Sequence, residues 1–167
     1  LIQISHYLGH IRGYDYVGTI NDAVNMDLTR YPGAFARSVN YVIAEETERS
    51  GGNKKLVAYY ASTGAEAHNS AFVYNDIIDI QMATDRIATI FSTDGTDTHI
   101  SSYDADLNFT TLKRTLTGKE VTNVVSKSGD EHYVLASGEI YLYNTTGNSL
   151  VLLNSGPYKC IAYNSVD

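Results

Sequence analysis

A short tyrosine-containing pattern occurs three times in this chain at nearly equal spacing. Each copy is a strand-like run that ends near a tyrosine and continues into polar turn residues. The shared tyrosines are Tyr60, Tyr103 and Tyr143, so the steps are 43 and 40 residues. A period of about 40 residues built from strand-like segments is typical of stacked β architectures, most often of a β-propeller. The pattern therefore predicts a scaffold of repeated sheets. The three copies span residues 57–64, 100–106 and 140–147.

A second landmark keeps the same period. Strand-like apolar runs begin near Ile77, Val121 and Cys160, at steps of 44 and 39 residues. Each unit then consists of a buried first strand, a β-rich second strand, a hairpin, a third strand with the tyrosine and a short fourth strand. We therefore predict an all-β fold of repeated four-stranded antiparallel units. It would be a propeller-like array, partial or complete, that occupies residues 1–167 as a single domain.

The first half of the chain follows this scheme less regularly. We expect residues 45–55 to form a long exposed hairpin in which Glu45, Glu46 and Glu48 are solvated. Residues 14–20 lie about one period before Tyr60 and are interpreted as a degenerate fourth copy. Further strands are expected at residues 1–11, 34–39, 41–44 and 71–74.

Composition favours strands and argues against two classes of function. Fourteen tyrosines, no tryptophan and a 43% share of hydrophobic residues indicate a folded, β-rich chain. A net charge of −7 argues against nucleic-acid binding, which needs clustered basic residues. No apolar run approaches about 20 residues, so no membrane span is expected. The single cysteine, Cys160, is expected to be a small buried side chain. The absence of an initiator methionine and the strand-like run at 159–163 suggest a fragment or a processed chain.

Few residues are candidates for chemistry. His6 and His10 lie four apart in a predicted strand, where such residues are about 13 Å apart, and this disfavours a metal site. Residues 104–108 begin like a calcium loop but lack its later glycine and acid, which favours a turn capped by its own side chains. Asp79 stands out because a carboxylate in an apolar strand is costly unless it is paired. We predict no catalytic residue, no metal, no cofactor and no enzymatic activity.

The tyrosines are the most plausible binding residues. They lie in or beside the predicted third strands, and alternation places Tyr141 and Tyr143 on the same face. Packing between adjacent sheets is one interpretation. The alternative is a binding face on which tyrosines stack on sugars or anchor a partner protein. The tentative binding residues are Tyr59, Tyr60, Tyr103, Tyr141 and Tyr143.

Two stretches resemble known propellers. Residues 131–147 and the strand after them resemble a blade of the propeller domain in tail nozzle proteins of short-tailed bacteriophages, and residues 29–33 with Val39-Asn40 are similar to a stretch near the start of such proteins. This resemblance implies a virion structural role in a ring at the tail tip, without catalytic residues. Residues 92–96 resemble the Asp-box hairpin of sialidase-like propellers, which implies a fold and not an activity.

The favoured function is that of a non-enzymatic structural or interaction protein. We expect a phage tail or other extracellular component that contacts partner subunits, in a homo- or hetero-oligomeric assembly, or a host surface that carries glycans. The expected location is the virion or the extracellular space. Two alternatives remain: a secreted carbohydrate-binding, lectin-like propeller, and a hydrolase of the glycosidase or sialidase type, which would need two convergent carboxylates.

Overall fold

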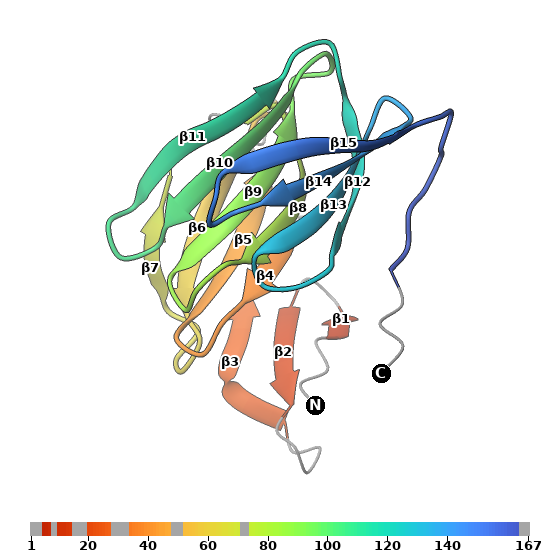
Figure 1. Ribbon diagram of the computed structural model, residues 1–167. Helices are drawn as coiled ribbons and strands as arrows, with labels where there is room; N and C mark the ends of the chain where they lie inside the picture. Colours follow the sequence, from red (N-terminus) through yellow and green to blue (C-terminus); the bar gives the residue numbers. More distant parts are fainter. Residues whose placement is uncertain are drawn as a thin grey trace.

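The computed structural model describes residues 5–7, 10–14, 20–27, 34–47, 52–70 and 74–163. Within these residues all regular structure is β, as predicted, and the strands form four antiparallel sheets (Figure 1). The first sheet has the three strands β1 (Ser5–Tyr7), β2 (His10–Tyr14) and β3 (Ile20–Asp27). The second sheet has β4 (Phe35–Arg37), β5 (Tyr41–Thr47), β6 (Lys54–Tyr60) and β7 (Glu66–Asn69).

The third and fourth sheets repeat the same four-stranded meander. The third sheet has β8 (Asp76–Met82), β9 (Ile87–Thr93), β10 (Thr98–Asp104) and β11 (Phe109–Leu116). The fourth has β12 (Val121–Ser126), β13 (Glu131–Ala136), β14 (Glu139–Asn144) and β15 (Ser149–Ser155). In each of these sheets, strands that follow one another in sequence are also hydrogen-bonded neighbours. The predicted four-stranded unit is therefore confirmed in three sheets.

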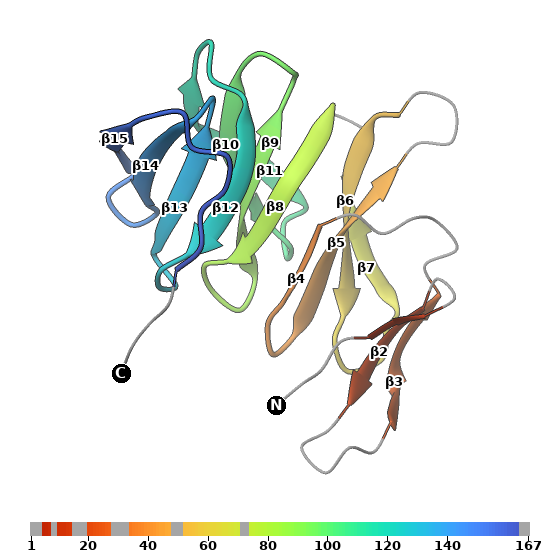
Figure 2. The same cartoon turned by 90° about the vertical axis from the view of Figure 1, so that its right-hand side faces the viewer.

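The first strands of the sheets lie next to one another. Strand β8 contacts β4 on one side and β12 on the other, and Figure 2 shows β8 between the second and fourth sheets. The fourth strands, β11 and β15, lie at the outer edges of their sheets and expose most of their side chains. Sheets that pack face to face with their first strands inward form a propeller-like array.

Apolar side chains from facing sheets form two cores. The core between the second and third sheets includes Ile43, Leu56, Ile80 and Tyr103. The core between the third and fourth sheets includes Ile100, Val134 and Tyr143. Strand β9 is buried along almost its whole length because it contributes side chains to both cores. This explains why its sequence, Ile-Ala-Thr-Ile-Phe-Ser-Thr, lacks charged residues.

Three aromatic rings meet in the second of these cores. Phe91 packs edge-on against Tyr143, with ring centroids 6.1 Å apart, and against His132 at 5.5 Å. The ring of His132 is buried, and neither of its nitrogens finds a hydrogen-bond partner among the described residues. Desolvation by this burial lowers the pKa of His132, although the nearby Asp130 carboxylate acts in the opposite direction. The imidazole therefore serves as a neutral packing group.

Equivalent turns show that the repeat alignment was wrong by one residue in its first copy. After the third strand of each sheet, one backbone N–H donates to the carbonyl just before the second strand: Ala61 to Asn40, Ala105 to Arg86, and Thr145 to Asp130. Counting back two residues gives the equivalent tyrosines, which are Tyr59, Tyr103 and Tyr143. The true steps are 44 and 40 residues. The tandem Tyr59-Tyr60 concealed this register, because only hydrogen bonds distinguish the two residues.

A repeated hydrogen-bonded clasp joins neighbouring sheets. Tyr103 donates from its hydroxyl to Asn108 Oδ1 at 3.1 Å, and Asn108 Nδ2 donates to the Asn69 carbonyl of the preceding sheet at 2.9 Å. One unit later, Tyr143 donates to Asn148 Oδ1 and Asn148 Nδ2 donates to the Lys113 carbonyl, both at 3.3 Å. Both asparagines have positive φ, 49° and 44°, a conformation that asparagine tolerates better than most residues. Gly64 occupies the equivalent turn position of the second sheet.

Replacing either clasp asparagine by alanine should destabilise the fold. Asn108→Ala and Asn148→Ala each remove two hydrogen bonds, leave a core tyrosine hydroxyl without its acceptor and place alanine at positive φ, which together should cost about 1–3 kcal/mol. Urea unfolding followed by circular dichroism measures this change. Asn75→Ala, in a loop outside the clasps, is the control and should change the stability by no more than about 0.5 kcal/mol. Equal effects of all three variants would contradict a specific role for the clasps.

Several local predictions are wrong. Residues 1–11 do not form one strand, because β1 ends at Tyr7 and β2 begins at His10 on a paired strand. The fourth strand of the second sheet is β7, which precedes the expected range 71–74, of which residues 71–73 lie outside the described residues. Residues 159–163 are not a strand, and Cys160 is exposed. Their apolar pattern matches a first strand, but no neighbouring second strand pairs with them in the structure.

Glu45 is also not solvated. Its carboxylate is buried, accepts a hydrogen bond from the Ala34 N–H at 3.2 Å and pairs with Lys54 Nζ at 2.5 Å. Glu46 pairs with Lys55 at 2.9 Å, and Glu48 lies outside the described residues. The acid-rich sequence looked like a surface hairpin because each glutamate finds its lysine partner only across the β5–β6 ladder.

Candidate functional site

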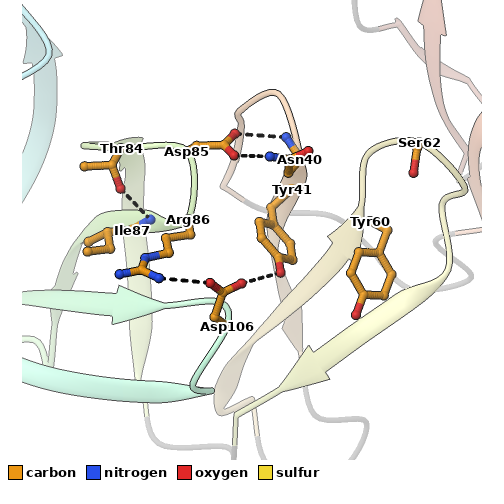
Figure 3. A pocket seen from close by; sticks show the side chains of 9 residues that line it. All are labelled: Asn40, Tyr41, Tyr60, Ser62, Thr84, Asp85, Arg86, Ile87 and Asp106. Atoms are coloured by element: carbon orange, nitrogen blue, oxygen red, sulfur yellow. Dashed lines mark hydrogen bonds and ion pairs between the residues drawn. The ribbon is translucent and has the colours of Figure 1, made fainter.

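A cleft opens between the second and third sheets at the end where their polar turns gather (Figure 3). We call it the turn cleft; its volume is about 630 Å³. It is formed by the turns that precede β5 and β9 and those that follow β6 and β10, because the antiparallel meander brings these four turns to one end of the sheets. The lining residues are Asn40, Tyr41, Tyr60, Ser62, Thr84, Asp85, Arg86, Ile87 and Asp106.

Two tyrosines form the aromatic wall of the turn cleft. Tyr41 begins β5 and Tyr60 ends β6, and they are directly paired across the ladder. Their ring centroids are 5.7 Å apart with planes tilted by 31°. Tyr60 is 42% exposed. The tyrosine wall is therefore held by the sheet while one ring remains accessible.

Asp106 connects the tyrosine wall to the opposite turn. Its Oδ1 accepts a hydrogen bond from the Tyr41 hydroxyl at 2.5 Å, and its Oδ2 pairs with Arg86 at 3.2 Å (Figure 3). The hydrogen bond to the Asp106 carboxylate is the main cause that raises the pKa of Tyr41 to about 12. The same hydrogen bond, followed by that from Arg86, lowers the pKa of Asp106. At neutral pH the phenol is therefore protonated and the carboxylate is ionised.

Asp85 fixes the other side of the cleft. Its Oδ1 accepts from the Asn40 backbone N–H at 2.9 Å, and its other oxygen accepts from the Asn40 side-chain amide. The Ser38 hydroxyl donates to the Asp85 carbonyl at 2.5 Å. The hydrogen bond from the Asn40 backbone is the main cause that lowers the pKa of Asp85. These bonds tie the β4–β5 turn to the β8–β9 turn and thus set the cleft width.

The structure separates the five tyrosines predicted to bind. Tyr103 and Tyr143 are buried in the two cores, which supports the packing interpretation and leaves neither ring accessible to a ligand. Tyr141 packs beside Tyr143, as alternation predicted, and its hydroxyl donates to Glu139 at 2.5 Å. Tyr59 is half-buried. Of the five, Tyr60 alone lines the turn cleft.

Sequence reasoning missed most of the turn cleft. Tyr41, Asp85, Arg86 and Asp106 are far apart in sequence and belong to two different repeats. A usable signal existed, because each of them directly follows a third strand or lies next to the start of a second strand. Aligning the repeats by these turns would have placed all four residues at one end of the array.

The remaining carboxylates of interest are structural. Asp79 is half-buried at a β-bulge of β8 and accepts from the Ile80 N–H at 2.9 Å and from Gln81 Nε2 at 2.6 Å. Burial raises the pKa of Asp79, and these two hydrogen bonds lower it. Asp104 accepts from the N–H groups of Asp106 and Leu107, so the predicted self-capped turn is confirmed.

The hairpin that resembles an Asp-box is likewise held by its own acid. Asp94 Oδ1 accepts from the N–H groups of Thr96 and Asp97 at 2.9 and 2.8 Å, and its Oδ2 contacts His99 Nε2 at 3.3 Å. These backbone hydrogen bonds lower the pKa of Asp94 to about 2. The carboxylate therefore shapes the loop between β9 and β10.

Comparisons with known proteins identify the fold and no more. No protein-family model matches the chain. No curated protein matches its sequence. Among solved structures, BamB from Moraxella catarrhalis matches with a TM-score of 0.51 and 15% identity, over 86% of this chain and 45% of that chain. The C-terminal WD40 domain of Sif2 matches with a TM-score of 0.52 and 9% identity, over 84% of this chain and 50% of that chain.

A third solved structure extends the likeness. Dihydro-heme d1 dehydrogenase NirN matches with a TM-score of 0.54 and 12% identity, over 93% of this chain and 38% of that chain. The chain has a propeller-like fold. It spans half or less of the length of each of these structures. The predicted propeller repeat is thus confirmed, and none of these matches is a phage tail protein.

Proposed function

We propose that the chain is a non-enzymatic interaction scaffold in an extracellular or virion assembly, where it contacts other protein subunits or a host surface. The observation that carries this proposal is the apolar character of the outer strands. Val151, Leu152 and Leu153 in β15 are 52%, 49% and 50% exposed, and Phe109 and Leu112 in β11 are exposed as well. Exposed apolar groups that gather on one element mark protein interaction sites more often than scattered ones do.

Other features support this proposal. The net charge of −7 disfavours nucleic acid as a partner, and in the turn cleft both carboxylates are held by groups of the chain itself, which is unlike a pair of carboxylates poised for hydrolysis. No helix among the described residues has the length and apolarity of a membrane span. The virion setting rests on the resemblance of residues 131–147, the β13–β14 hairpin and the turn after it, to phage nozzle blades.

The test is the association state of the purified full chain. Sedimentation velocity over a wide concentration range should reveal an assembly larger than one chain, and the double variant Val151→Glu, Leu153→Glu should weaken it about tenfold or more. Leu107→Glu, which alters an exposed leucine in the β10–β11 turn, is the matched control. A chain that sediments as a monomer throughout, or an assembly indifferent to the outer-strand variant, would contradict the proposal.

A further inference from the structure

The turn cleft presents an accessible aromatic face next to fixed polar groups. Tyr60 leaves 42% of its surface exposed, while its neighbour Tyr41 is immobilised through Asp106. A rigid aromatic face with an adjacent hydroxyl can stack against an apolar ring surface and bond to its polar edge at the same time. Such a face loses little conformational entropy when a ligand binds.

The charges in the turn cleft select against strongly charged ligands. Asp85 and Asp106 would repel a phosphate or carboxylate, and Arg86 would repel a basic side chain. Asn40 and Ser62 add uncharged polar groups to the same lining. The wall therefore alternates hydrogen-bond donors with acceptors, which is the complement of a ligand that carries several neighbouring hydroxyl groups.

We propose that the turn cleft binds a neutral saccharide unit, which stacks on Tyr60 and forms hydrogen bonds through its hydroxyls to Asp106, Arg86 and Asn40. The proposal rests on the proposed function, in that the saccharide belongs to the host surface that the scaffold contacts. The cleft volume of about 630 Å³ lies within the range of small-ligand pockets. Both carboxylates have lowered pKa values and remain hydrogen-bond acceptors at neutral pH.

The roles of the residues differ in the proposed complex. Asp106 accepts from a sugar hydroxyl through the lone pairs that Tyr41 and Arg86 leave free. Arg86 is 56% exposed and keeps further N–H donors available for a sugar oxygen. Tyr41 is a positioning residue, since its hydroxyl is already committed to Asp106.

The experiment is saturation-transfer NMR of the full chain with methyl glycosides of glucose, galactose, mannose and N-acetylglucosamine as probes. At least one of them should bind, and Tyr60→Ala should weaken binding about tenfold or more, because aromatic stacking contributes on that scale. Tyr60→Phe should retain most of the affinity, and Asp106→Asn should lose part of it. Tyr158→Ala, which alters an exposed tyrosine outside the cleft, should bind as the unaltered chain does.

Three results would overturn the proposal: none of the neutral glycosides binds, Tyr60→Ala binds as well as Tyr158→Ala does, or an acidic sugar or a basic peptide is preferred. Thermal melting of every variant distinguishes lost binding from lost folding. Sedimentation of the same variants separates this proposal from the preceding one, because cleft variants should leave the assembly intact and outer-strand variants should leave glycoside binding intact.

Discussion

Replacing Phe91 by alanine should lower the free energy of unfolding by about 3–5 kcal/mol, the range measured when a large aromatic side chain is removed from a protein core. Phe91 is fully buried and is packed edge-on against both Tyr143 and His132. These two residues belong to the fourth sheet, so the substitution would open a cavity at the boundary between two sheets. A shift of the urea midpoint, with the slope of the transition unchanged, would report this loss.

Phe109→Ala is the matched control for this substitution. Phe109 begins the outer strand β11 and is exposed, so its removal should change the free energy of unfolding by no more than about 0.5 kcal/mol. Similar losses for the two phenylalanines would show that the third and fourth sheets do not share a core. A large loss for Phe91 together with a shallower unfolding transition would show that the two sheets unfold separately.

Mild acid should destabilise the protein through His132. Burial lowers the pKa of this imidazole in the folded chain, whereas in the unfolded chain it titrates near its ordinary value of 6.5. Below about pH 6.5 the unfolded state therefore binds the extra proton, and stability falls as pH falls, with a slope of at most about 1.4 kcal/mol per pH unit. The loss levels off once the pH drops below the folded-state pKa, because both states are then protonated.

The variant His132→Phe isolates this effect. It removes the titrating group together with two buried nitrogens that have no hydrogen-bond partner among the described residues, so it should flatten the stability profile between pH 6.5 and 5. His132→Leu serves the same purpose if the larger ring distorts the core. His99→Gln keeps the buried imidazole and should keep the acid sensitivity. An unchanged pH profile in both His132 variants would show that another group is responsible.

The acid response has a second, separate window. Hydrogen bonds lower the pKa values of Asp85, Asp94 and Asp106, and for Asp94 the value is about 2. Each of these carboxylates stabilises the folded state above its unfolded-state pKa, and this contribution is lost as pH falls through the lower, folded-state value. Because the ordinary value for an aspartate is 3.8, this loss begins near pH 4 and does not overlap the His132 window.

Strands were the most predictable part of the structure. Runs such as Ile77–Met82 and Glu131–Ala136 announce themselves by apolar content and by the turn residues around them, and they appear as β8 and β13. The period could be found because equivalent strands carry similar side chains. Register was harder, since Tyr59 and Tyr60 are chemically the same and only the Ala61 hydrogen bond decides between them.

Long-range pairing was the part that sequence could not supply. Glu45 looks like a surface residue until Lys54 and the Ala34 N–H meet it in space. Residues 159–163 look like a strand, yet a strand needs a neighbour to receive its hydrogen bonds. The turn cleft escaped for the same reason, because the partners of Asp106 are Arg86 in its own sheet and Tyr41 in another.

The clasps have an evolutionary consequence. Each one uses a single asparagine side chain on one side and a main-chain carbonyl on the other, at Asn69 or Lys113. A carbonyl is offered by every residue type, so the receiving sheet needs no matching side chain. Duplication or deletion of one 40- to 44-residue segment would leave such a joint intact, and arrays of different lengths can arise in this way without redesign of the contact.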